Sequence, residues 1–236
     1  MDTTTMLAAF GLTRQEAKLY IALHGRGAAT GYELARDTGV SRSNAYASLA
    51  SLADKGAASV IDGAPLRYQA VAAGEFCANQ VRTLREYQAR LERELVLVDD
   101  EDSPYLTIRG GKNISNKIKT IIAGTAQRIY LAMPAHILRE FVPLLEEAAA
   151  RKRKVVVITG SGVKIAGAIV HHSKTLTDSV RAIADSAVTL TGELNASESC
   201  SCVYSMKKNM ANLIRESIRN EIRLIELQEN GGAKQP

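Results

Sequence analysis

Residues 12–71 constrain the fold of this chain most strongly, because they contain two helix-start signals separated by a short span. Thr13 is followed three residues later by Glu16, and Thr30 is followed three residues later by Glu33. In such a capping box, the threonine hydroxyl and the glutamate carboxylate each accept a hydrogen bond from a backbone amide near the helix start. The sequence therefore predicts two short helices that begin at these threonines.

A third helix is predicted from Ser41, after a tight turn at residues 38–41. Residues 38–53 contain no Asp or Glu, so this helix could approach a polyanion without carboxylate repulsion. Gly56 ends the helix, and a strand, a Pro-containing turn and a second strand are predicted at residues 57–61, 62–65 and 66–71. Helix, helix, turn, helix and a two-stranded wing predict a winged helix-turn-helix in residues 1–72, a module that reads DNA.

One face of the third helix is suited to contact with DNA. At 100° per residue, Leu49 and Leu52 belong to its buried stripe, and the first turn is free to enter the major groove. Arg42 and Asn44 could donate there to base edges or phosphates, and Arg67 on the wing could reach a neighbouring phosphate. A winged helix used only for protein contacts is the alternative. The predicted DNA-binding residues are Ser41, Arg42, Ser43, Asn44, Tyr46, Ala47 and Arg67.

A long helix with a coiled-coil seam is predicted for residues 73–98. Mostly apolar residues recur at alternating spacings of four and three, the rhythm of the a and d positions of a coiled coil. Gln88 lies at the centre of this seam, where a buried polar residue would fix the register of two copies. A single helix packed on its own domain is the alternative. The predicted dimer contacts are Val81, Leu84, Gln88, Leu91, Leu95 and Val98.

The acidic run at residues 99–102 and the Ser-Pro pair after it predict a boundary, because acids oppose the helix dipole there and Pro favours an extended chain. Beyond it, strands and helices alternate, which predicts an α/β domain at residues 104–236. We expect strands at residues 105–109, 128–133, 154–159, 180–184, 187–190 and 200–204, and helices at 113–123, 135–150, 163–170 and 207–229.

This third region carries nineteen basic and eleven acidic residues, so a small anionic or phosphorylated effector is predicted. Ligands of open α/β sheets bind beyond the carboxyl ends of strands, and glycine lets a backbone approach closely. The basic run at residues 151–154 is a further source of charge, while an ordinary turn and a solvated helix end are the alternatives. The predicted effector site is Thr159, Gly160, Ser161, Gly162 and Lys164.

Three stretches resemble the TrmB family of transcription regulators: residues 12–20 (LTRQEAKLY), 28–35 (AATGYELA) and 39–46 (GVSRSNAY). The Gly110 turn and the following helix, strand and helix resemble the phospholipase D-like module that follows the coiled-coil helix in that family. The resemblance implies an α+β winged helix domain (1–72), a coiled-coil linker helix (73–103) and an α/β phospholipase D-like domain (104–236). It also implies a homodimeric, sequence-specific DNA-binding transcription regulator whose effector changes the spacing or rigidity of the two winged helices.

The phospholipase D resemblance raises the question of enzymatic activity. That superfamily uses the pattern His-x-Lys-x-x-x-x-Asp twice, with His as the nucleophile and Lys on the phosphate. His172 and Lys174 match its start, but Ser179 stands where Asp is required and no second copy exists. We therefore predict no enzyme. The alternative is an effector-binding or phosphodiesterase-like domain whose winged helix serves only assembly.

Three cysteines, Cys77, Cys200 and Cys202, do not form a disulfide framework, which favours a reducing cytoplasm. Cys200 and Cys202 would share one face of a strand and could meet a metal or an oxidant, with buried packing as the alternative. No metal or cofactor is predicted. The start of the chain lacks signal-peptide character, and no apolar run reaches the ~20 residues of a membrane span. The expected partners are double-stranded DNA, a second copy of the chain and a small effector, with no membrane.

Overall fold

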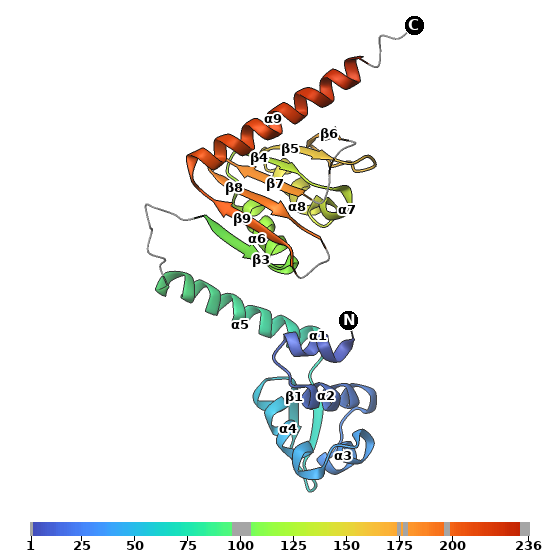
Figure 1. Ribbon diagram of the computed structural model, residues 1–236. Helices are drawn as coiled ribbons and strands as arrows, with labels where there is room; N and C mark the ends of the chain where they lie inside the picture. Colours follow the sequence, from blue (N-terminus) through green and yellow to red (C-terminus); the bar gives the residue numbers. More distant parts are fainter. Residues whose placement is uncertain (1, 96–104, 174–175, 177–178, 196–198, 232–236) are drawn as a thin grey trace. The chain divides into compact units, whose positions relative to one another are not determined.

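The computed structural model describes residues 2–95, 105–173, 176, 179–195 and 199–231. The chain divides into two compact units, Met1–Val98 and Asp99–Pro236 (Figure 1). Across the described ranges, no helix has both the length and the apolar character required to cross a membrane.

The N-terminal unit is a winged helix followed by a long helix. Both predicted capping boxes are confirmed, with Thr13 and Glu16 starting one helix and Thr30 and Glu33 the next. Gly39 has a left-handed backbone (φ 69°), which ends the second of these helices and redirects the chain. The elements are α1 (Thr3–Ala9), α2 (Arg14–Arg26), α3 (Gly31–Thr38), α4 (Arg42–Asp54), β1 (Ala58–Ile61), β2 (Arg67–Ala70) and α5 (Ala73–Glu94).

A buried carboxylate joins α2 to the end of α4. Glu16 is only 5% exposed, and it accepts a hydrogen bond from the Thr13 amide at 2.7 Å as part of the cap. Ser51 Oγ donates to it at 2.7 Å and Lys55 Nζ at 2.6 Å. Lys55 also donates to the carbonyl oxygen of Gly11 at 2.9 Å. Because one carboxylate serves both the start of α2 and the end of α4, it fixes how these helices lie on each other.

The first turn of α5 belongs to the same core. Phe76 is 1% exposed, and its ring lies 5.8 Å from the ring of Tyr20 on α2. The Tyr20 hydroxyl donates to the carbonyl oxygen of Val71 at 2.8 Å, just before α5 begins. These contacts attach the start of the long helix to the winged helix. Its orientation therefore follows from the core of the domain.

Helix α1 was not predicted from the sequence. Asp2 caps it by accepting a hydrogen bond from the Thr5 amide at 2.7 Å. Leu7 is its one buried residue, and it packs in the winged-helix core. A helix of seven residues with a single buried side chain has no repeating apolar pattern, so periodicity could not reveal it.

The C-terminal unit contains one seven-stranded mixed sheet with strand order β3-β9-β8-β7-β4-β5-β6. Only β4, β5 and β6 pair in parallel, and the remaining neighbours are antiparallel. The elements are β3 (Leu106–Arg109), α6 (Gly111–Gly124), β4 (Arg128–Ala132), α7 (Ala135–Leu138), α8 (Val142–Ala150), β5 (Lys154–Thr159), β6 (Ile169–His172), β7 (Ser179–Ala184), β8 (Val188–Glu193), β9 (Ser201–Ser205) and α9 (Lys208–Gly231).

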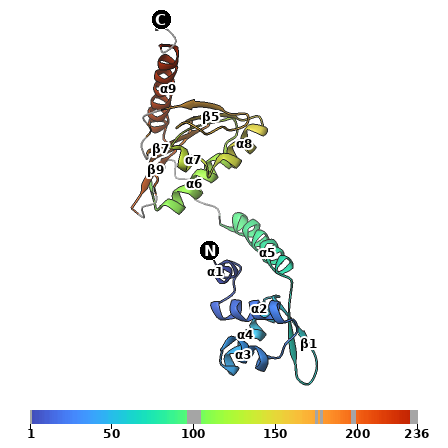
Figure 2. The same ribbon diagram turned by 90° about the vertical axis from the view of Figure 1, so that its right-hand side faces the viewer.

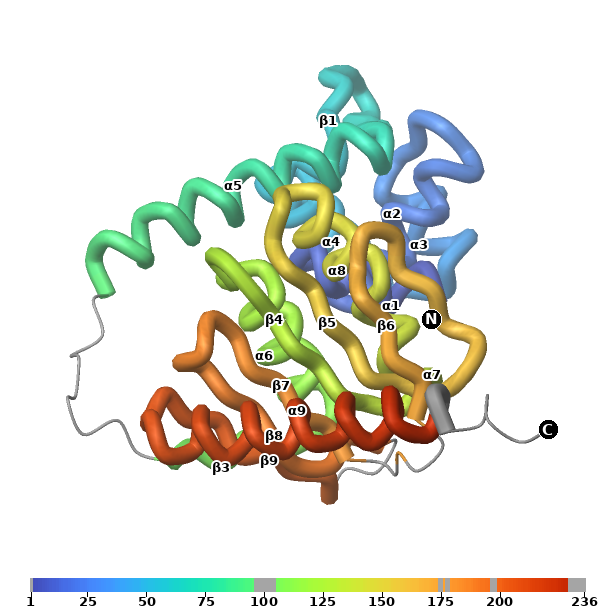
Figure 3. The backbone as a smooth tube through the Cα atoms, turned by 90° about the horizontal axis from the view of Figure 1, so that it is seen from above, coloured from blue at the N-terminus to red at the C-terminus, as the bar shows by residue number. Residues whose placement is uncertain are grey.

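Helices cover both faces of this sheet. Helices α6 and α8 pack on one face, where Val155 and Val157 of β5 join the main core. On the opposite face α9 crosses β6, β7 and β8 (Figure 3). Ile214 and Ile218 of α9 are buried there with Ile158 of β5. The period-two alternation of β5 thus serves two cores, as expected for a strand buried on both sides.

Two predictions for this unit were wrong in detail. The single helix expected at residues 135–150 is split into α7 and α8, with Pro143 in the first turn of α8, where its missing amide is tolerated. The weak helix expected at residues 163–170 is absent, and β6 begins at Ile169. Gly162 and Gly167 have φ angles of 86° and 74°, which a right-handed helix excludes.

Replacing Glu16 with Ala should destabilise the N-terminal unit by about 2–3 kcal/mol, because Lys55, Ser51 and the Thr13 amide lose a buried acceptor. Glu33→Ala is a matched control, since Glu33 also closes a capping box but pairs only with the surface residue Arg26. It should cost about 1 kcal/mol. Amide hydrogen exchange of the full chain over α2 and α4 measures both changes, and equal losses would contradict the tertiary role of Glu16.

The same network should make the N-terminal unit sensitive to acid. Burial raises the pKa of Glu16, but hydrogen bonds from Lys55, the Thr13 amide and Ser51 outweigh it, so its pKa lies below the ordinary value of 4.5. The stabilisation is therefore complete above pH 4.5 and is lost as pH falls through the lower folded-state pKa. The difference in α2 protection between the native chain and Glu16→Gln should shrink on acidification. A difference independent of pH would contradict this linkage.

Candidate nucleic-acid interface

The first turn of α4 is an exposed surface held on a buried stripe. Ala45, Leu49 and Leu52 are fully buried, as the periodicity predicts. The opposite side of the helix is open to solvent, and its first turn contains no acidic residue. The residues expected to contact DNA that lie exposed on or next to α4 are Ser41, Arg42, Ser43, Asn44, Tyr46 and Ala47.

Arg42 is positioned by an aromatic ring from the neighbouring helix. Its guanidinium carbon lies 4.4 Å from the centroid of the Tyr32 ring on α3, and Tyr32 is itself 47% exposed. Stacking on an aromatic face orients the guanidinium and leaves its N–H groups free for an acceptor. Sequence reasoning missed Tyr32, because its proximity to Arg42 depends on how α3 and α4 cross. Only the presence of an aromatic residue early in α3 could have suggested it.

Tyr46 has a packing role in addition to its exposed surface. Its ring lies against the backbone of Gly31 at the start of α3, so closely that a Cβ atom at Gly31 would be 2.6 Å from Tyr46 Cε1. The ring is still 44% exposed. Tyr46 therefore helps to join α3 and α4 at the surface that Arg42 and Asn44 present.

The wing carries the remaining predicted contact. Strands β1 and β2 form an antiparallel hairpin that stands beside α2, α3 and α4 (Figure 2). Arg67 opens β2, and its Nη2 donates to the carbonyl oxygen of Ala28 at 2.5 Å. The adjacent Tyr68 exchanges backbone hydrogen bonds with Ala29. Arg67 is thus an exposed cation at the end of β2 that adjoins the wing turn, where it pairs with Ile61 of β1.

Acidic residues near the helix-turn-helix are neutralised within α2 and α3. Arg26 forms ion pairs with Glu33 at 3.1 Å and also with Asp37. Asp37 contacts Arg36 as well. Local neutralisation reduces the repulsion that these carboxylates would exert on a polyanion at α4.

The predicted seam of α5 is exposed along its described part. Leu84, Leu91 and Leu95 are 56%, 51% and 70% exposed, and Val81 is 37% exposed. Gln88 is also exposed, and its amide donates to Glu92 one turn later at 2.8 Å. The helix was expected to reach residue 98, but α5 ends at Glu94, so Leu95 follows the helix with a non-helical backbone, and Val98 lies outside the described part of the chain. The described seam residues are therefore not covered by the winged helix of their own chain.

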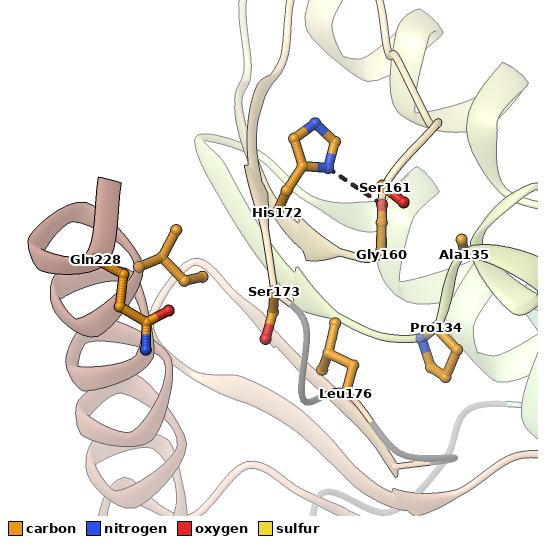
Figure 4. Close-up of a pocket in the computed structure, with 9 residues that line it drawn as sticks. Pro134, Ala135, Gly160, Ser161, His172, Ser173, Leu176 and Gln228 are labelled. Carbon is orange, nitrogen blue, oxygen red and sulfur yellow. Dashed lines mark hydrogen bonds between the residues drawn. The ribbon is translucent and has the colours of Figure 1, made fainter. Parts of the chain in front are cut away.

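The predicted effector segment borders a cavity of about 670 Å³ beyond the carboxyl ends of β4, β5 and β6. Gly160 and Ser161 line it, and His172 Nδ1 forms a hydrogen bond of 3.1 Å with the carbonyl oxygen of Gly160. Gln228 of α9 lies on one side, and Pro134 and Ala135 lie on the other (Figure 4). This is the position at which open parallel sheets bind ligands.

Other predicted effector residues do not line this cavity. Thr159 is fully buried at the end of β5, and Gly162 and Lys164 are exposed and do not line the cavity. The basic run begins before β5 and ends at Lys154, the first residue of that strand, so it lies at the opposite end of β5 from Thr159. No Lys or Arg occurs among the described lining residues. The expected preference for an anion is therefore not supported here.

The cysteines on β9 and before it pack in the core. Cys200 and Cys202 are 3% and 1% exposed, and burial raises the pKa of the Cys202 thiol to about 11. That thiol is therefore protonated near neutral pH and is a poor metal ligand or nucleophile. Within the described ranges, no three His, Cys, Asp or Glu side chains are grouped as a metal site would require. Lys174, the second residue of the phospholipase D-like pattern, lies outside these ranges.

Comparison with known proteins agrees with the winged-helix geometry. Residues 7–73 match the family model described as sugar-specific transcriptional regulator TrmB. The winged helix of this chain is a TrmB-type domain. The match covers the winged helix that carries Arg42, Tyr32 and Arg67. The TrmB resemblance proposed from the sequence is thereby confirmed.

Other similar proteins extend beyond this domain. The uncharacterized protein YrhO of Bacillus subtilis (strain 168) is 29% identical over 157 residues, which span 65% of this chain and 57% of that protein. An archaeal chromatin protein, TrmBL2, has a solved structure with a TM-score of 0.45 and 20% identity, covering 93% of this chain and 96% of that one. NucT from Helicobacter pylori has a TM-score of 0.43 and 12% identity, covering 50% of this chain and 94% of that one.

Proposed function

We propose that this protein is a transcription regulator that binds double-stranded DNA through α4 and the wing. The observation that carries the proposal is the exposed, acid-free first turn of α4, with Arg42 held over the Tyr32 ring. A helix presented in this way can place a guanidinium fork against the O6 and N7 acceptors of guanine in the major groove. The description of the matched family as transcriptional regulators supports the same function.

The proposal includes a homodimer formed through α5. Leucines repeated at coiled-coil spacing and more than half exposed are costly on an isolated surface helix. Pairing two copies along this seam would remove them from water and place two winged helices on one DNA duplex. Two linked half-site contacts would give tighter binding than one.

The proposal also includes a small effector at the cavity beside Gly160 and Ser161. The polar groups available there are the Ser161 hydroxyl, the His172 imidazole and the Gln228 amide, with apolar contacts from Pro134 and Ile225. Such groups suit an uncharged ligand with several hydroxyls better than an anion. The sugar-specific description of the family is consistent with that chemistry.

A fluorescence anisotropy titration tests the DNA function directly. The full chain is titrated against labelled duplex DNA from the region upstream of its own gene, with a shuffled duplex of the same composition as the control. Preference for the native sequence supports the proposal. Equal and weak binding to both duplexes would instead favour a winged helix that serves only protein assembly.

Arg42→Ala should weaken binding to the preferred duplex by about 1–3 kcal/mol, because it removes a base contact. Tyr32→Leu should weaken it by less, because the guanidinium remains but loses its orienting ring. Arg67→Ala should reduce binding to the native and shuffled duplexes alike and flatten the salt dependence, as expected of a phosphate contact. The anisotropy titration at two salt concentrations measures all three, and unchanged affinity in Arg42→Ala would remove Arg42 from the interface.

Leu91→Glu should convert the protein to monomers and greatly weaken DNA binding, because it places a charge in the middle of the α5 seam. Leu213→Glu is the matched control: Leu213 is also exposed, at 62%, but lies on α9. It should leave the dimer intact. Light scattering measures the molecular mass of both variants, and an unchanged dimer in Leu91→Glu would show that α5 is not the dimer contact.

A further inference from the structure

A second cavity, of about 340 Å³, lies between α9 and the start of β4, where four arginines converge. Arg215, Arg219 and Arg223 come from α9, and Arg128 opens β4. Glu226 is the one carboxylate among the described lining residues. We name this group of four arginines with its cavity the arginine pocket. It is distinct from the cavity beside Gly160, which borders the opposite end of β4.

The three arginines of α9 recur every fourth residue, so they lie on one face of the helix at intervals of about 6 Å. None of them forms an ion pair with any described residue. Like charges at this spacing destabilise a helix, because they repel each other. The cavity therefore has an excess of positive charge, which the single carboxylate of Glu226 offsets only in part.

Arg181, which lies beneath α9, differs from the three arginines of α9 because it forms an ion pair. This β7 residue donates to Glu221 at 2.5 Å and to Ser217 at 2.8 Å, both on α9. An arginine that packs α9 on the sheet thus has acidic and hydroxyl partners for its terminal N–H groups, although its Nε, like that of Arg215, is buried without a hydrogen-bond partner among the described residues. The arginine pocket differs in having cations without such partners, which distinguishes it from a structural ion pair.

Arg215 also has a hydrogen-bond donor without a partner in the described part of the chain. Its Nε is buried and has no hydrogen-bond partner among the described residues. A buried N–H without an acceptor is costly, and such groups in native proteins often mark ligand or ion contacts. Because Arg181 Nε is unpartnered in the same way among the described residues outside this cavity, the argument for an anion rests on the four converging guanidinium groups.

We propose that the arginine pocket binds a small phosphorylated ligand. Guanidinium groups bind phosphate oxygens in a bidentate manner, and several of them can hold a dianion or diphosphate. Tyr130, Ile183 and Ile222 provide an apolar wall for the organic part of the ligand, and the Ser186 hydroxyl adds a polar contact. The concave shape favours a compact molecule over a duplex, which would contact only the exposed ends of the arginines.

The Arg128 side chain also interacts with Asp185, which limits its contribution to anion binding. Burial raises the pKa of Asp185, but backbone hydrogen bonds from Ala126, Arg128 and Gln127 outweigh it, and the positive charge of Arg128 lowers the pKa a little further. Arg128 is therefore partly committed to this turn. Arg219 and Arg223, which are exposed and unpaired within the described residues, are the better positions for testing the site.

Isothermal titration of the full chain with inorganic pyrophosphate and with glucose 6-phosphate tests the proposal, with glucose as the uncharged control. Either phosphorylated probe should bind and raise the melting temperature, whereas glucose should not compete with it. Arg219→Gln and Arg223→Gln should each reduce the affinity for the probe about tenfold or more, since each removes a charge-assisted contact. Lys208→Gln removes the same charge from α9 outside the pocket and should leave the affinity unchanged.

Absence of binding by both phosphorylated probes would overturn the proposal. So would an equal loss of affinity in Lys208→Gln, since that would indicate attraction by net charge alone. A third contrary result is loss of duplex DNA affinity in the arginine variants without any pyrophosphate binding, which would assign the row to DNA phosphates. Gln228→Ala should not alter pyrophosphate binding, so the outcome is independent of the cavity beside Gly160.

Discussion

The winged helix depends on one buried carboxylate. Glu16 completes the cap of α2 and holds Ser51 and Lys55 near the end of α4. Without it, the Thr13 amide would lose its acceptor, and Lys55 would keep only the Gly11 carbonyl oxygen at the packing surface of these helices. The direction of α4, and with it the presentation of Arg42, follows from this contact together with the apolar stripe of α4. Glu16, whose protonation should destabilise the domain in acid, is therefore also the residue that fixes the position of the exposed helix α4.

The contact between Arg42 and Tyr32 has a comparable effect at the surface. An arginine side chain that is free to rotate loses conformational entropy when it binds a partner. Stacking on Tyr32 already restricts Arg42 in the folded protein, so less entropy is lost on binding. Tyr46, resting on Gly31, holds the adjoining part of α3 against α4. The two tyrosines thus give a short helix-turn-helix a more rigid outer surface than its small size alone would provide.

In the C-terminal unit, the placement of α9 creates two different sites. The helix crosses one face of the sheet, leaving a cavity beyond the carboxyl ends of β4 to β6 and another at the start of β4. The first is lined by uncharged groups and the second by arginines. The basic excess of residues 104–236 is thus concentrated partly at the arginine pocket, at the start of β4, whereas the Gly-Ser-Gly turn where the sequence suggested a bound anion borders the cavity beyond the end of β4.

Local sequence determined the helices and strands that are specified by residues a few positions apart. Capping boxes at Thr13 and Thr30, the apolar stripe of α4 and the β-branched run of β5 depend on residues a few positions apart, and each specified its element correctly. Tertiary structure alone decided which distant groups meet. Arg128 joins the arginines of α9 because β4 and α9 pack on each other, and Tyr32 reaches Arg42 because α3 and α4 cross. Such pairings depend on the packing of whole elements, for which spacing along one chain carries no signal.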